Sequence, residues 1–124
     1  MAYCIIWKES GTILNFSGDL SIKEINEANG FLHGNYRIES HRYTIWDLLG
    51  ANLSSITEDE IDIPAAIDMP AARYVRKIKV LLVVQEAHAT QLCKRYIKTA
   101  SELIPNWEFA IFNSMADAKK WIDS

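Results

Sequence analysis

Two short apolar runs constrain the fold of this chain more than any other feature. Residues 43–48 read Tyr-Thr-Ile-Trp-Asp-Leu, and residues 80–84 read Val-Leu-Leu-Val-Val. Their near-continuous apolar character is typical of strands that are buried on both faces, as in the interior of a mixed or parallel sheet. We therefore expect them to be neighbouring strands that run in the same direction. The first should stop at Asp47 or Leu48 and then turn through Gly50 and Asn52.

Three further strands and about four helices complete the predicted order. Residues 3–8 and 12–16 are predicted to form a hairpin around Gly11, which would supply the positive φ of a tight turn. A last strand is expected over residues 107–112. After the hairpin each strand is followed by a helical pattern, so right-handed crossovers predict a largely parallel sheet. The expected fold class is α/β, with a mixed, largely parallel five-stranded sheet and an opening β-hairpin.

Capping signals place the first two helices. Ser21 and Glu24 have capping-box spacing, which predicts a helix over residues 21–33 that Gly34 closes in a left-handed cap. We expect the connector over residues 35–42 to be polar and exposed. A second capping box begins at Thr57 and predicts one short helical turn there.

Proline and apolar spacing place the remaining helices. Pro64 and Pro70 interrupt the helix that starts near Thr57, so a second short helix is expected to begin near Pro64. An unbroken apolar face from Ala89 onward predicts a long helix that ends at Pro105. A final helix is predicted to start at residues 114–117.

Composition bounds the class of protein. A chain of 124 residues that is 49% hydrophobic and 23% charged fits one soluble domain over residues 1–124. A formal net charge of −3 does not favour nucleic acid as a partner. The sequence shows no signal peptide and no apolar run of the ~18 residues that a membrane span needs, so we expect a cytoplasmic protein. Cys4 and Cys93 occupy apolar positions and are expected to be reduced core residues.

Several sequence segments, spread over nearly the whole chain, resemble those of one protein family. They are residues 15–20, Trp46-Asp47-Leu48-Leu49-Gly50, residues 80–84, Arg95-Tyr96 and residues 111–122. Together with the strand order, they resemble the SpoIIAA-like proteins of the STAS superfamily. This resemblance implies a bacterial cytoplasmic domain with a mixed sheet backed by helices. Proteins of the SpoIIAA-like branch have no assigned activity. Some of them resemble lipid-carrier domains in fold, and this likeness implies at most an apolar cavity.

The phosphorylation motif of related anti-sigma-factor antagonists is incomplete in this chain. In those proteins an Asp-Ser-Ser-Gly motif after the central strand holds the phosphorylated serine. The nearest positions here, Ser54-Ser55-Ile56-Thr57-Glu58, lack both the Asp and the Gly. A phosphate on Thr57 would also face three acidic residues that follow it, and like charges repel. We therefore expect a module without a clear phosphoswitch.

The end of the central strand is the first candidate binding surface. Asp47 lies at the expected carboxyl end of that strand, where open α/β sheets place ligands. The alternative is that its oxygens accept backbone amides of the next turn. Ser54, Ser55 and Thr57 lie in the same stretch, and each also has the alternative role of a helix cap. A protein partner is expected to dock on these four residues.

An apolar ligand between the helices and the sheet is the second candidate. Lys94 or Arg95, on the polar side of the long helix, would lie near its polar end, or else they form part of a solvated rim. The aromatic residues that could line such a cavity, or simply fill the core, are Trp7, Phe16, Trp46, Phe109 and Trp121.

Catalytic and metal motifs do not emerge from the sequence. His33, His41 and His88 are scattered, and no Gly-x-Ser-x-Gly elbow accompanies them. The cysteines and histidines have none of the short paired spacings of zinc sites. We therefore expect that the protein is not an enzyme and that it binds neither a metal nor a cofactor. The predicted function is a non-catalytic regulatory or protein-interaction module of the STAS type, or alternatively a binder of a small apolar or lipid-like ligand. We also expect a homodimer, because a hairpin edge needs cover.

Overall fold

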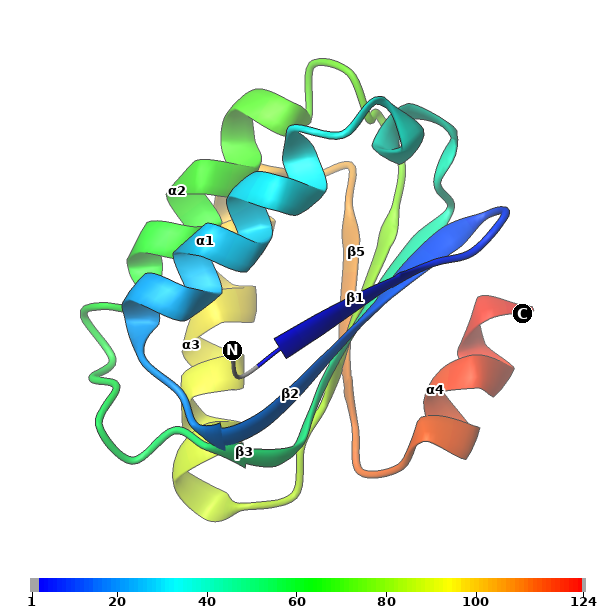
Figure 1. Ribbon diagram of the computed structural model, residues 1–124. Helices are drawn as coiled ribbons and strands as arrows, with labels where there is room; N and C mark the ends of the chain where they lie inside the picture. Colours follow the sequence, from blue (N-terminus) through cyan, green and yellow to red (C-terminus); the bar gives the residue numbers. More distant parts are fainter. Residues whose placement is uncertain (1–2, 124) are drawn as a thin grey trace.

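The computed structural model describes residues 3–123, which form a mixed five-stranded sheet with helices on both faces (Figure 1). The strands lie across the sheet in the order β1 (Tyr3–Trp7), β2 (Gly11–Asp19), β3 (Tyr43–Asn52), β4 (Lys79–Val83) and β5 (Glu108–Phe112). β1 is antiparallel to β2, and each later neighbouring pair is parallel. The predicted α/β class and the parallel pairing of β3 with β4 are confirmed.

Three helices cover one face of the sheet, and a fourth covers the other (Figure 1). The first group is α1 (Ile22–His33), α2 (Asp62–Ala71) and α3 (Ala87–Leu103), and the fourth helix is α4 (Met115–Ile122). A short 3₁₀ helix, η1 (Tyr36–Ser40), leads from α1 toward β3. The structure therefore has two cores, and the larger lies under α1, α2 and α3.

Alternate residues of β3 face these two cores, because successive side chains of a strand point to opposite faces. Trp46 and Leu48 pack toward α1, α2 and α3. Ile45 belongs to the smaller core beside α4. Asp47 lies two residues after Ile45, so it shares the α4 face and points away from the three-helix layer.

The predicted end of the central strand is wrong. β3 does not stop at Asp47 or Leu48 but continues to Asn52. β2 continues alongside it to Asp19, after a register shift between Asn15 and Ser17. The ladder therefore pairs the backbone of residues 50–52, and the turn expected through Gly50 and Asn52 does not form.

Two glycines have different roles from those expected. Gly11 has no positive φ, and a Cβ there would lie 2.3 Å from the Tyr43 ring, so the glycine makes room for that ring. Gly34 caps α1 with a φ of −79° rather than in the left-handed region, and its N–H donates to the Gly30 carbonyl at 2.9 Å. Among residues 3–123 only Gly18 has a positive φ.

Local expectations for the helices are partly confirmed. The capping box between Ser21 and Glu24 is present at the start of α1. Thr57 and Glu60 exchange the corresponding bonds, but residues 58–61 form turns, and α2 begins only at Asp62. Pro64 fits the first turn of α2, where its missing N–H leaves no helical carbonyl unpaired.

Two expectations about burial are wrong. The connector after α1 is not uniformly exposed, because η1 directs Ile38 into the larger core and His41 is also buried. Cys4 is exposed, because it lies on the edge strand β1 and faces away from the larger core, against which Tyr3, Ile5 and Trp7 pack. Cys93 is buried as expected, and burial raises the pKa of its thiol to about 12.

Burial of His41 predicts that stability falls in mild acid. The ring shares a hydrogen bond of 2.9 Å with Thr12, and burial, followed by the charge of Arg37, lowers the pKa of His41 below 6.5. The unfolded chain therefore takes up this proton at a higher pH than the folded chain. We expect the free energy of unfolding, measured by urea titration, to decrease as pH falls from 7 through the lowered pKa. In His41→Gln this contribution to the slope should disappear, and an unchanged slope would contradict the prediction.

Candidate functional site

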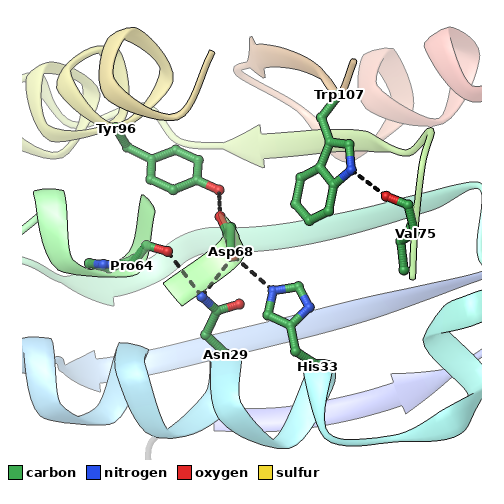
Figure 2. Close-up of polar contacts among 7 residues, drawn as sticks. All are labelled: Asn29, His33, Pro64, Asp68, Val75, Tyr96 and Trp107. Atoms are coloured by element: carbon green, nitrogen blue, oxygen red, sulfur yellow. Dashed lines mark hydrogen bonds and ion pairs between the residues drawn. The ribbon is translucent and has the colours of Figure 1, made fainter. Parts of the chain in front are cut away.

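Asp68 on α2 is the one Asp or Glu that is buried among the residues the structure describes, with 2% exposure. Three side chains donate hydrogen bonds to its carboxylate (Figure 2). Asn29 Nδ2 lies 2.9 Å and His33 Nε2 lies 2.7 Å from Oδ1, and the Tyr96 hydroxyl donates to Oδ2. A charged group can stay in a protein core only when donors surround it in this way. We call Asp68, Asn29, His33 and Tyr96 the Asp68 cluster.

The cluster joins three helices. Asn29 and His33 lie one turn apart on α1, Asp68 comes from α2, and Tyr96 comes from α3 (Figure 2). Burial, followed by the negative charge of Asp68, raises the pKa of Tyr96 well above its ordinary value. The Tyr96 hydroxyl therefore keeps its proton and remains a donor to the carboxylate.

Two small cavities adjoin the cluster on the sheet side of the helices. The larger, of about 40 Å³, is lined almost entirely by apolar side chains. The smaller, of about 10 Å³, is lined by residues that include His33, Thr44 and Asp68. Asn29, Trp46 and Tyr96 line both cavities. Of the five aromatic residues proposed from the sequence as cavity-lining, only Trp46 lines either of these two spaces; the others pack in the cores.

The structure separates Asp47 from the cavities. Asp47 faces the α4 side of the sheet, and its Oδ1 accepts the backbone N–H of Leu49 at 3.2 Å. It lies within β3 rather than at the strand end, so its predicted place at a ligand crevice beyond that end is wrong. Its backbone contact is the alternative role that the sequence allowed.

The three hydroxyl residues after β3 are exposed. Thr57 bonds with Glu60, and Ser55 Oγ donates to the Leu20 carbonyl at 3.4 Å. The backbone N–H of Ser54 donates to Asn52 Oδ1 at 3.0 Å. Within residues 3–123 no hydrogen bond joins Asp47 to any of these three residues, so the four predicted residues do not form one hydrogen-bonded site.

Arg95 and Lys94 do not reach the cavities. Arg95 forms a bidentate ion pair with Asp62 of α2, with Nε–Oδ1 and Nη2–Oδ2 distances of 3.0 and 2.8 Å. The Thr99 hydroxyl also donates to Asp62, and these bonds, that of Arg95 foremost, lower the pKa of Asp62. Arg95 therefore ties α3 to α2 at the surface, and Lys94 is exposed. Tyr96 faces the core, as predicted for that helix.

Sequence reasoning missed Asn29, His33 and Asp68, although a signal was present. Asn29 lies on the same face of α1 as the apolar residues Ile25 and Leu32. Asp68 has the corresponding position on α2, four residues after the buried Pro64. A polar residue within the apolar stripe of a helix indicates that its side chain is buried. The sequence pattern does not show that the two buried polar residues contact each other.

Comparison with models of known protein families found no match, and comparison with curated proteins found none either. In the part of the chain that the structure describes, His, Cys, Asp and Glu side chains do not gather in threes as metal ligands would. None of the helices within residues 3–123 has the length and apolar character to cross a membrane.

Removing the buried carboxylate tests how much it stabilises the helical layer. Asp68→Ala leaves three buried donors without their acceptor, so we expect the free energy of unfolding to fall by about 3 kcal/mol or more. Urea unfolding followed by tryptophan fluorescence measures this loss. Asp59→Ala is the matched control, because Asp59 is exposed and its removal should change stability by less than about 0.5 kcal/mol. Equal effects of both substitutions would contradict a structural role for the cluster.

Proposed function

We propose that this chain is a non-catalytic regulatory module of the STAS type that binds a small, mainly apolar ligand between the sheet and α1, α2 and α3. The mixed sheet backed by helices agrees with what the resemblance to SpoIIAA-like proteins implies. The observation that carries the proposal is the apolar cavity of about 40 Å³ beside the Asp68 cluster. An apolar space with a few convergent polar groups is the usual form of a small-molecule site.

The residues that line this cavity come from α1, α2, α3, the strands β3 and β4, and the segment between β3 and α2. Its lining is formed by Ile25, Asn29, Trp46, Leu48, Leu53, Ile61, Pro64, Leu82, Leu92, Cys93 and Tyr96. Asn29 and Tyr96 supply polar groups, and the remaining contacts are almost all apolar. Both polar side chains are held by Asp68, so neither is free to swing into the space and fill it.

Volume limits the size of the ligand. About 10–15 Å³ is enough for one water, so a space of about 40 Å³ exceeds a simple packing defect. Sites for drug-sized molecules measure about 300–1,000 Å³, so the same space does not hold a lipid chain without movement of the helices. An apolar cavity that binds benzene measures about 150 Å³. The structure therefore supports a ligand no larger than a single ring, which enters with a small shift of the helices, more directly than the lipid-like ligand that the sequence suggested.

Substitutions at Cys93 test the site in both directions. Cys93→Met adds volume within the cavity, and Cys93→Ala removes volume. With benzene as probe, we expect shifts of the Leu53, Leu82 and Leu92 methyl signals in NMR spectra of the natural sequence. These shifts should vanish in Cys93→Met and persist in Cys93→Ala. Benzene shifts that survive Cys93→Met, or that spread to the exposed Leu103, would count against the cavity as a binding site.

A protein partner at the loop after β3 is the second candidate function. This loop is held rigidly, because Leu53 and Ile56 are buried and the Ile56 carbonyl lies 3.0 Å from His88 Nε2. The rigid loop presents Ser54 and the acidic residues Glu58 and Asp59 to solvent. A fixed acidic surface is complementary to a basic protein surface. The predicted homodimer and the cytoplasmic location stay predictions.

Charge reversal tests this second candidate. A protein partner captured from the native host by the natural sequence should be lost with Glu58→Lys, because the substitution places a positive charge on the docking loop. Glu39→Lys, on the exposed surface of η1, makes the same charge change elsewhere and should retain the partner. Quantitative mass spectrometry of the captured proteins compares the two. Retention by both variants would contradict docking on this loop.

A further inference from the structure

Three buried polar atoms beside the cavities have no hydrogen-bond partner among the described residues: Asn29 Oδ1, His33 Nδ1 and Thr44 Oγ1. Asn29 is 1% exposed and Thr44 is 2% exposed. All three residues line the cavity of about 10 Å³, and Asn29 also lines the larger apolar cavity. An unpaired polar atom in a protein core is unfavourable, so a ligand atom that pairs with one gains affinity.

The orientation of the Asn29 amide follows from its neighbours. Its Nδ2 lies 2.9 Å from Asp68 Oδ1 and 3.4 Å from the Pro64 carbonyl, and both of these atoms are acceptors (Figure 2). Only the nitrogen end of an amide donates, so the opposite orientation would bring oxygen against oxygen. Asn29 Oδ1 is therefore the end that remains without a partner, and it can only accept.

The same reasoning fixes the His33 ring. Its Nε2 lies 2.7 Å from Asp68 Oδ1, so Nε2 carries a proton and donates. In the neutral ring Nδ1 then holds a lone pair and accepts. The Thr44 hydroxyl rotates and is able to donate or accept. With a neutral His33 ring, two of the three unpaired atoms are therefore acceptors.

We propose that this site selects ligands that carry a hydrogen-bond donor on an apolar body, such as a phenol, an alcohol or an amide, and that it rejects carboxylates. The inference rests on the proposed ligand site and names its chemical class. A ligand hydroxyl donates to Asn29 Oδ1 or His33 Nδ1 and accepts from the Thr44 hydroxyl. A carboxylate has no proton to give, so it leaves these acceptors unpaired.

Charge around the site acts in the same direction. The Asp68 carboxylate accepts hydrogen bonds from the Asn29 amide and the His33 ring, and all three residues line the smaller cavity. Neither cavity has a Lys or Arg among its lining residues, and Arg95 is engaged by Asp62 outside them. A ligand carboxylate would thus enter a low-dielectric space near a like charge without a cation to offset it. This places the polar end of the ligand at α1 and β3 rather than at Lys94 or Arg95.

Three probes with one ring and different polar groups test the inference: phenol, benzene and benzoate. Dissociation constants come from NMR titrations at pH 8, followed on the Leu92 methyl signals. We expect phenol to bind about fivefold more tightly than benzene, and benzoate to bind at least tenfold more weakly than phenol. Benzoate binding as tightly as phenol, or phenol binding no better than benzene, would overturn the selectivity while leaving the ligand site intact. If none of the probes binds, the proposed function itself fails.

A pair of threonine variants locates the selectivity. Thr44→Val keeps the side-chain shape but removes the hydroxyl, so the preference for phenol over benzene should fall about twofold, because the acceptors on Asn29 and His33 remain. Thr12→Val is the matched control, because Thr12 is also fully buried but bonds to His41 and lines neither cavity. It should lower stability and leave the preference unchanged. A preference that is unchanged in Thr44→Val, or that falls equally in both variants, would contradict the role of Thr44.

Discussion

A carboxylate in a protein core must be surrounded by donors, and this constraint sets the arrangement of the helical layer. Asp68 brings α2 into a position where donors from α1 and α3 both reach it. The pair between Arg95 and Asp62 joins α2 to α3 a second time, at the surface. Apolar contacts between helices allow sliding, whereas hydrogen bonds to one carboxylate allow a single geometry. The hydrogen bonds to Asp68 thus favour one packing arrangement of the three helices.

The small cavities are a consequence of the same hydrogen bonds. Apolar side chains can change rotamer to fill space in a core, and interiors are normally packed without voids. Asn29 and Tyr96 do not have this freedom, because Asp68 fixes the position of their polar groups (Figure 2). Space remains where these two side chains meet Trp46 of the sheet. The polar cluster and the apolar space beside it are therefore parts of one arrangement.

The sequence predicted those features that depend on local patterns. Parallel pairing of β3 with β4 followed from two apolar runs, and the start of α1 followed from Ser21 and Glu24. Features that depend on distant partners were missed. The end of β3 depends on how far β2 accompanies it, and no local signal at Gly50 reports that. Asp68 meets Asn29 across 39 positions of the chain, so an apolar stripe with one polar residue indicates burial but not the partner.

The Tyr43 ring lies over Gly11 at the first rung of the ladder between β2 and β3. Even a methyl group at Gly11 would overlap the ring, so the two positions act as one steric unit. Relatives of this chain are free to vary position 11 only where position 43 has become smaller or has turned its side chain elsewhere. Covariation of these two positions would then be the trace of a packing requirement, and it would carry no information about ligand or partner.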